Sequence, residues 1–276
     1  MINRLLGISA AILLSTAAAG AQQLPERITG AGLINVGIER DHPPMEFVDP
    51  KTGELVGFDV DLINAIAQEL GVKLAYVHSR FEGLTPNLQS KRIDLIISGM
   101  YDTPARRENF DFVDYLSAGA VFFTLDRNSD IQKPIDLCGK VVTANRGTSY
   151  PASVEKWSSE NCVSAGLPPI EVITDTDMAS EFLYLNQGRA QGSLQGTEAI
   201  PTVLASKEGP FRTLGGPFTD VKVGIGFRKD DPELRDAVLA ALEKVFTSGK
   251  YSELIAKWGI QASALDKPTV NQGAAP

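Results

Sequence analysis

Apolar side chains recur at helical spacing early in the chain. Leu62, Ile66 and Leu70 stand at positions i, i+4 and i+8, so they share one face of a helix. The opposite face is polar and includes Asn64. This pattern predicts an amphipathic helix over Asp59–Leu70 that packs on a sheet.

Short apolar runs flank this helix and alternate with further helical patterns. The run Ile93–Ser98 is mostly apolar, as in a strand that is covered on both faces. The resulting βαβαβ order predicts a parallel sheet with helices on both sides. The expected elements are strands at 33–38, 72–78 and 93–98 and a helix that Thr85-Pro86 opens as N-cap and first residue.

A similar α/β unit starts near residue 119, and a third stretch follows it. Two such units in one chain predict two lobes. Ligands of α/β sheets bind at the carboxyl ends of strands and near helix N-termini, so we expect the ligand between the lobes. The expected elements are strands at 141–144, 170–173, 190–194 and 223–227, with helices opened by Gly147-Thr148-Ser149-Tyr150, over 177–187, 231–247 and 251–258.

The N-terminal segment has the pattern of a secretory signal peptide. Arg4 precedes an apolar run, and small residues lead to an expected cleavage site after Ala21. The apolar run is too short to span about 30 Å of hydrocarbon, which argues against a membrane anchor. We therefore expect residues 1–21 to be removed and the protein to be free in the periplasm.

Charge excludes some partners. The formal net charge of −8 becomes −9 without Arg4, the one charged residue of the signal segment. Such an acidic chain is a poor match for nucleic acid or for anionic membrane surfaces.

The two cysteines, Cys138 and Cys162, predict one structural disulfide in an exported protein. A redox or metal pair is the alternative. It is weaker because there is no C-x-x-C spacing and only His42 and His78 could assist.

The segment Gly57-Phe58-Asp59-Val60-Asp61-Leu62 resembles the G-F-D-[apolar]-D-[apolar] signature of the family 3 bacterial extracellular solute-binding proteins, which serve amino-acid ABC importers. Residues 246–251 and 257–259 resemble the closing segment of the same family. The resemblance implies an α/β type II periplasmic binding protein. Each of its lobes is a doubly wound, mostly parallel sheet flanked by helices, and the ligand cleft lies between the lobes. The implied parts are lobe 1 at 24–118 plus 223–262 and lobe 2 at 119–222. Residues 263–276 are rich in Ala, Pro, Gln and Gly, and this composition predicts a flexible tail.

Arg106 is the sharpest candidate for a ligand contact. Thr103-Pro104 should open a helix and place Arg106 in its first turn, where the helix dipole disfavours a cation. An anionic partner would explain a guanidinium there, and its fork fits a carboxylate. The alternative is an ordinary solvated arginine. By resemblance, Arg106 clamps the α-carboxylate of the ligand.

The resemblance also assigns ligand contacts to the loops that follow the predicted strands. The turn Gly147-Thr148-Ser149 offers backbone N–H groups to the same carboxylate from the second lobe. We expect no catalytic residue, no metal and no cofactor. The further candidates for ligand contact are Glu39, His42, Phe81, Ser98, Gly99, Tyr101, Thr148, Ser149 and Gln195.

Two positions depart from the family pattern. Tyr101 stands where a Ser or Thr hydroxyl is common, and Gly196 stands where an aspartate binds the α-ammonium group. A buried ammonium without a counter-charge is costly. Either Glu39 or Glu198 supplies the charge, or the ligand lacks a primary α-amine, as in an N-substituted or cyclic amino acid or a related carboxylate.

These observations predict a monomeric periplasmic receptor that captures a small carboxylate solute and delivers it to a membrane-embedded ABC permease. An enzyme of the cyclohexadienyl dehydratase type, which resembles this family, is the alternative. It would need a cleft carboxyl, Glu39 or Glu198, with a raised pKa. A sensor module is a third class, and the lack of a second membrane span in the sequence counts against it.

Overall fold

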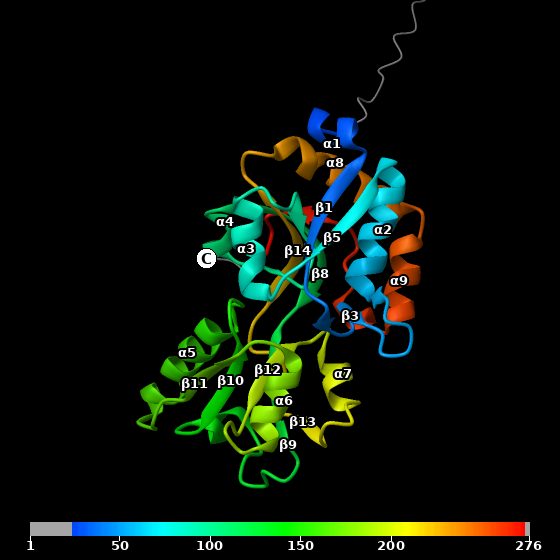
Figure 1. Ribbon diagram of the computed structural model, residues 1–276. Coiled ribbons are helices and arrows are strands. Elements are labelled where there is room, and N and C mark those ends of the chain that lie inside the picture. Colours follow the sequence, from blue (N-terminus) through cyan, green and yellow to red (C-terminus); the bar gives the residue numbers. More distant parts are fainter. Residues whose placement is uncertain (1–23, 274–276) are drawn as a thin grey trace, which may run out of the picture.

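The computed structural model describes residues 24–273 and shows two lobes, one above the other in Figure 1. The predicted signal segment lies outside the described residues. The strands are β1 Leu33–Ile38, β2 Asp41–His42, β3 Glu46–Val48, β4 Leu55–Val56, β5 Lys73–His78, β6 Leu95–Ile96, β7 Tyr101–Asp102, β8 Phe110–Ala118, β9 Ala120–Leu125, β10 Val141–Asn145, β11 Glu171–Asp175, β12 Ser193–Gly196, β13 Phe211–Thr213, β14 Val221–Arg228 and β15 Thr269–Val270. The helices are α1 Glu26–Ala31, α2 Phe58–Leu70, α3 Phe81–Gln89, α4 Pro104–Arg107, α5 Tyr150–Asn161, α6 Met178–Asn186, α7 Ile200–Leu204, α8 Pro232–Thr247 and α9 Lys250–Trp258, with 3-10 turns η1 Pro134–Leu137, η2 Val163–Ala165 and η3 Gln261–Ser263.

The first lobe is built on a sheet with strand order β15-β8-β14-β6-β1-β5. β1 runs parallel to β5 and β6, as the βαβαβ pattern predicts, while β14 is antiparallel to β6 and β8. Helices α3 and α4 cover one face, and α2, α8 and α9 cover the other (Figure 1). The sheet is therefore mixed, whereas the sequence predicts a mostly parallel sheet.

The second lobe contains the parallel pair β10-β11 and the antiparallel group β12-β9-β13. A parallel bridge between Val142 and Gly192 joins the two groups. Helices α5, α6 and α7 belong to this lobe (Figure 1). Its sheet is also mixed, because β9 is antiparallel to both of its neighbours.

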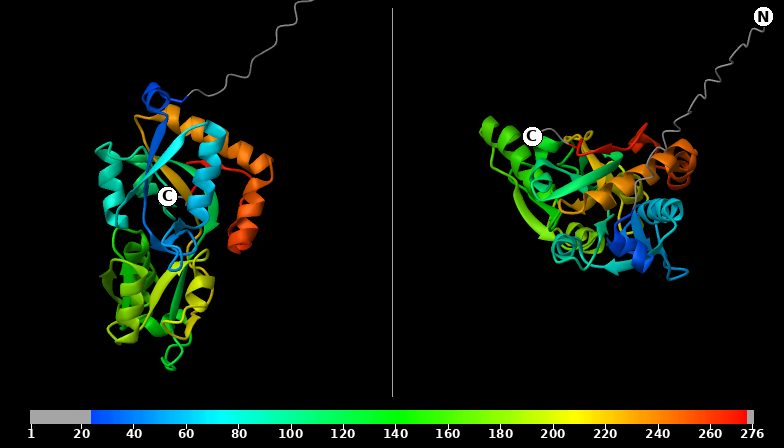
Figure 2. Two further views of the ribbon diagram at one scale, coloured as in Figure 1. Left: turned by 45° about the vertical axis from the view of Figure 1, so that its right-hand side comes forward. Right: turned by 90° about the horizontal axis from the view of Figure 1, so that it is seen from above.

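The chain passes between the lobes from β8 to β9 and returns from β13 to β14, and both views of Figure 2 show the two lobes joined through this region. β8 and β14 pair along their whole length up to Ala118 and Val221. A Cβ atom on Gly119 would lie 2.3 Å from the Thr219 carbonyl oxygen, so the glycine lets the two crossing segments pass closely. The lobe boundaries expected at 118/119 and 222/223 stay predictions.

Helix α2 confirms the amphipathic pattern, with Leu62, Ile63 and Ile66 fully buried. Asp59, in the motif at its start, is buried as well. Its Oδ2 accepts a hydrogen bond from the Gly99 backbone N–H at 2.8 Å, and its Oδ1 accepts one from the Tyr115 hydroxyl at 2.8 Å. The carboxylate therefore ties this helix to the loop after β6.

Three expectations about elements were wrong. Helix α3 begins at Phe81 rather than Thr85, and Pro86 lies inside it. The apolar face that α3 buries starts at Phe81 and continues through Leu84 and Leu88, so packing outweighs the one hydrogen bond that the proline removes. β12 runs over Ser193–Gly196 rather than 190–194. Of the buried run at 93–98, only β6 pairs as a strand.

The expected flexible tail is also wrong for its described part, residues 263–273. Thr269 and Val270 pair with β8 as β15. The backbone N–H of Gln272 donates to Asp114 Oδ2 at 3.0 Å, and that of Gly273 donates to Asp102 Oδ2 at 2.7 Å. Buried carboxylates of the first lobe thus fix a segment whose composition alone predicts disorder.

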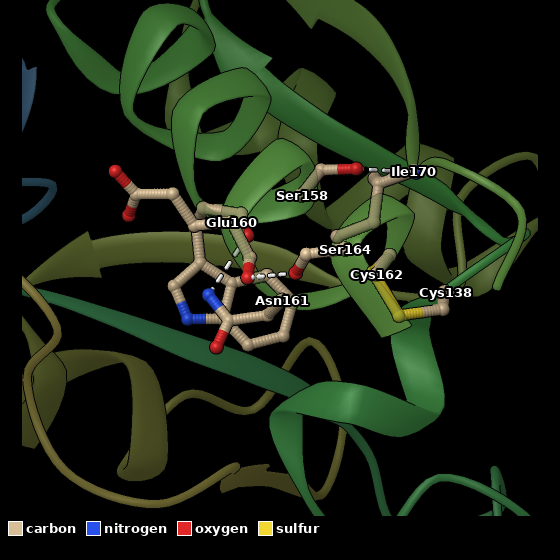
Figure 3. The surroundings of a disulfide bond; sticks show 8 residues. Cys138, Ser158, Glu160, Asn161, Cys162, Ser164 and Ile170 are labelled. Carbon is tan, nitrogen blue, oxygen red and sulfur yellow. Dashed lines mark hydrogen bonds between the residues drawn. A yellow bond between two sulfur atoms is a disulfide. The ribbon is translucent and has the colours of Figure 1, made fainter. Parts of the chain in front are cut away.

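The disulfide Cys138–Cys162 is confirmed, with a Cα–Cα distance of 5.6 Å. It joins the end of η1 to the end of α5 (Figure 3). Beside it, Ser158 Oγ accepts a hydrogen bond from the Ile170 backbone N–H at 2.8 Å, which ties α5 to the start of β11. Within residues 24–273, no helix is both long and apolar enough to cross a membrane.

Candidate functional site

A cavity lies between the lobes and takes lining residues from both. It contains about 480 Å³ of empty space, counting the part that opens to solvent. The loops after β1, β6 and β10 supply much of its wall, as the sequence predicts. Nine of the ten predicted contact residues line it: Glu39, His42, Phe81, Gly99, Tyr101, Arg106, Thr148, Ser149 and Gln195.

Ser98 is the predicted residue that does not line the cavity. Its side chain is fully buried. The hydroxyl accepts a hydrogen bond from the Glu39 backbone N–H at 3.0 Å and donates one to Glu46 Oε1 at 2.6 Å. It therefore holds the loop after β1 in place from behind the cavity wall.

Arg106 occupies the position that the sequence predicts. Thr103 caps α4, and its Oγ1 accepts a hydrogen bond from the Arg106 backbone N–H at 3.4 Å. The guanidinium lies over the Phe81 ring, 5.3 Å from its centroid. Burial lowers the pKa of Arg106 to about 10, so the side chain stays charged at neutral pH. A desolvated, oriented guanidinium facing a cavity is suited to bind a carboxylate.

The two lobes meet around this guanidinium. Arg106 Nη1 donates to the Tyr101 carbonyl oxygen at 2.8 Å, and Nη2 donates across the cleft to the Gly147 carbonyl oxygen at 3.2 Å. The hydroxyls of Tyr101 and Tyr150 are 3.2 Å apart, again across the cleft. At the rim, Arg80 pairs with Asp177 at 3.2 Å. The cleft is therefore closed in this structure.

The turn before α5 is also built as a binding loop. The Thr148 hydroxyl donates to the Asn145 carbonyl oxygen at 2.6 Å and accepts from the Tyr150 backbone N–H at 3.1 Å. Gly147 has a left-handed φ of +83°, and a Cβ atom there would lie 2.8 Å from Glu82 Cα. The glycine thus permits both the turn and the contact between lobes.

Carboxyl groups line the side of the cavity that faces the rim. Glu39 Oε1 accepts a hydrogen bond from the Phe81 backbone N–H at 2.7 Å. Burial, followed by the nearby charge of Asp41, raises the pKa of Glu39 to about 8. Burial also raises the pKa of Asp41. Within residues 24–273, neither carboxyl forms an ion pair, so a cation brought to this side would find two carboxyls without an ionic partner.

Among the described residues, Glu39, His42 and Glu46 form a group whose possible metal-ligand atoms all lie within 4.8 Å of one another. Burial lowers the pKa of His42 to about 4, so its ring is neutral at physiological pH. Burial, and then the charge of Asp59, raises the pKa of Glu46 well above its usual range. Glu39 and His42 line the cavity, whereas Glu46 lies behind its wall and accepts a hydrogen bond from the Ser98 hydroxyl.

Gly196, where the family pattern has an acid, sits against another carboxyl group. A Cβ atom on Gly196 would lie 1.9 Å from Glu198 Oε1. Glu198 is 1% exposed, and burial raises its pKa to about 7. The volume that a side chain at position 196 would fill is therefore taken by Glu198.

Four lining residues were missed as ligand contacts. Tyr150 and Met178 follow the predicted helix starts, and Asn145 directly follows the strand predicted at 141–144, so the rule that ligands meet strand ends and helix starts could have found all three. Asp41 begins the short strand β2 that follows β1. No local pattern separates it from an ordinary loop aspartate.

Comparison with known proteins gives one consistent result. The family model of the bacterial extracellular solute-binding proteins, family 3, matches residues 34–261. The lysine/arginine/ornithine-binding periplasmic protein of Escherichia coli (strain K12) is 31% identical, over 94% of this chain and 97% of that protein. The structure of holo ArgBP from T. maritima is 33% identical with a TM-score of 0.73, covering 85% of this chain and 99% of that one.

A third similarity concerns the enzyme alternative. An ancestral amino-acid-binding protein described as a precursor of cyclohexadienyl dehydratase is 31% identical with a TM-score of 0.72, covering 84% of this chain and 97% of that one. These matches confirm the type II periplasmic binding fold and the prediction of a binding protein rather than an enzyme. The chain belongs to the bacterial extracellular solute-binding proteins, family 3.

Proposed function

We propose that this protein captures a free amino acid in the cleft between its lobes and delivers it to an ABC permease. The observation that carries the proposal is Arg106, a half-buried guanidinium in the cavity wall that is contacted from both lobes. Its two terminal nitrogens point at carbonyl oxygens, which a carboxylate can replace with stronger, charge-assisted bonds.

The proposed ligand class is an amino acid with a basic side chain. Arg106 and the carboxyls of Glu39 and Asp41 line the same cavity, so it offers a cation and unpaired acids to one molecule. A ligand with a carboxylate and a side-chain cation matches both. The relatives from E. coli and T. maritima point to the same class. The first is named for binding lysine, arginine and ornithine, and the second has an arginine-bound structure.

Delivery follows from closure. Residues of both lobes line the cavity, so a ligand makes its full set of contacts only when the lobes are together, and binding shifts the equilibrium toward the closed form. A permease can then recognise the closed form. We further propose that the mature protein starts after Ala21 and works in the periplasm, which agrees with the relatives named as periplasmic.

The dehydratase alternative keeps one supporting observation, a cleft carboxyl with a raised pKa at Glu39. A general acid needs such a group. The binding assignment stands ahead of it because the named relatives are binding proteins. Incubation with prephenate or arogenate is expected to give no aromatic product.

Thermal shift over a panel of amino acids, betaines and organic acids tests the proposal. The correct ligand at 100 times its Kd should stabilise the protein by about 2.7 kcal/mol, because it binds the native state alone. We expect arginine, lysine or ornithine to raise the Tm most. A panel in which organic acids without an amino group raise it and amino acids do not would contradict the proposal.

The Arg106→Ala variant tests the carboxylate contact. It should weaken binding by about 30-fold or more, since the loss of one partner of a desolvated charge pair costs about 2–5 kcal/mol. Arg189→Ala is the matched control. Arg189 is exposed and stacks on Tyr184 in the second lobe, so the variant removes the same charge away from the cleft. Equal affinities for the two variants would refute the role of Arg106.

A further inference from the structure

Glu198 is a buried carboxyl that forms no ion pair within residues 24–273 and has only the Tyr101 side chain and its own backbone N–H as nearby donors. Its side chain is 1% exposed, and both carboxyl oxygens are buried without a hydrogen-bond partner. No Lys or Arg in the described part of the chain forms an ion pair with it, and the strongest charge acting on it is the negative Asp59. A carboxylate in such a place is costly unless a cation or a donor joins it.

The carboxyl lies next to the cavity rather than elsewhere in the lobe. Glu198 follows β12, whose residue Gln195 lines the cavity. Burial, and then the charge of Glu198, raises the pKa of both Tyr101 and Tyr150, which also line the cavity. Glu198 therefore lies close to the two tyrosine side chains that meet across the cleft.

Arg106 brings the carboxylate end of the ligand to the same place. Its Nη1 donates a hydrogen bond to the carbonyl oxygen of Tyr101. Tyr101 therefore contacts the guanidinium through its backbone and lies close to Glu198 through its side chain. In an α-amino acid the carboxylate and the ammonium are borne by the same carbon atom. A cation site and an anion site side by side are what such a molecule requires.

We propose that Glu198, assisted by the Tyr101 hydroxyl, pairs with the α-ammonium group of the bound amino acid. The proposal rests on the proposed function and assigns a residue within that site. It accounts for both departures from the family pattern together. The larger Tyr101 occupies the place of a small hydroxyl residue, and the acid comes from position 198 while Gly196 leaves room for it.

This geometry changes two expectations. The ligand need not lack a primary α-amine, because a counter-charge is present. Addition of an acid by Gly196→Asp, the obvious way to restore the family pattern, would place the new Cβ 1.9 Å from Glu198 Oε1. The single substitution is therefore expected to weaken binding of α-amino acids instead of improving it.

Calorimetric titration of Glu198→Gln with two compounds tests the assignment. The compounds are L-arginine and δ-guanidinovaleric acid, which is arginine without its α-amino group. The wild type should bind arginine about 100-fold more tightly than the analogue. The variant should lose that preference, while its affinity for the analogue should stay close to that of the wild type. The ligand-free variant should melt no lower than the wild type, because it removes an unpaired buried carboxyl.

The outcomes separate the two proposals. The assignment of Glu198 is overturned, while the proposed function stands, if the variant keeps the wild-type preference for arginine or if its affinity for both compounds falls by the same factor. A wild type that binds neither compound and no other α-amino acid overturns the proposed function and this assignment together. As a second arm, Gly196→Asp combined with Glu198→Ala should bind arginine at least 10-fold more tightly than Gly196→Asp alone. Failure of that rescue contradicts the steric part of the proposal.

Discussion

Reduction of the Cys138–Cys162 disulfide is expected to destabilise the second lobe by a calculable amount. The two cysteines are 24 residues apart. In the chain-entropy model, a closed loop of this length restricts the unfolded chain by about 3.5 kcal/mol at 25 °C. Because Cys162 is fully buried, substitution would add a packing loss, so the same sequence is compared with and without reductant.

Guanidinium unfolding followed by tryptophan fluorescence measures this difference. A Trp258→Phe background leaves Trp157, in α5 beside the disulfide, as the reporter of the second lobe. With a slope of about 4 kcal/mol/M, reduction should lower the midpoint by roughly 0.9 M. Ligand affinity of the reduced protein should be unchanged, since neither cysteine lines the cavity. A midpoint shift below about 0.3 M would refute the loop-entropy reasoning.

Two further predictions follow from single positions. Gly147→Ala should weaken ligand binding by about 10-fold or more, because its Cβ would press on Glu82 Cα across the closed cleft. Gly166→Ala, which has a similar left-handed φ of +73° but no atom within 4 Å, is the matched control, and equal affinities for the two variants would contradict the contact. Burial raises the pKa of Asp114 from its ordinary value of 3.8 to about 6. The folded state therefore loses stability as the pH rises from about 4 to above 6, because Asp114 ionises more readily in the unfolded chain. Asp114→Asn should therefore gain stability relative to wild type between pH 4 and pH 7, by at most about 3 kcal/mol in chemical denaturation, and a pH-independent difference would disprove this.

Regular periodicity and loop position allowed much of the fold to be predicted. Helix α2 and strands β1 and β5 follow local patterns, and Asp177 caps α6 as expected. Parts that depend on distant partners were not predicted. The C-terminal segment has few apolar residues, and its order depends on pairing with β8 and on hydrogen bonds to the buried carboxylates of Asp102 and Asp114.

The candidate site shows the same division. Arg106 could be identified because its place in a helix start is electrostatically unusual, whereas the supporting roles of Ser98 and Asp59 could not be predicted from the sequence. Ser98 is a supporting hydroxyl behind the wall, and Asp59 of the family motif holds the backbone of Gly99. From the sequence, Glu198 is one of two candidates, with Glu39, for the counter-charge to an α-ammonium group. That Glu198 packs against Gly196 is visible only in the three-dimensional structure.

Calorimetric titration of the wild type with L-arginine and with agmatine tests the central claim most directly. Agmatine has the guanidinium end of arginine and lacks its carboxylate, so it removes only the group that Arg106 is proposed to hold. The account predicts that arginine binds at least about 100-fold more tightly than agmatine, which corresponds to about 2.7 kcal/mol. Equal affinity for the two compounds would contradict it.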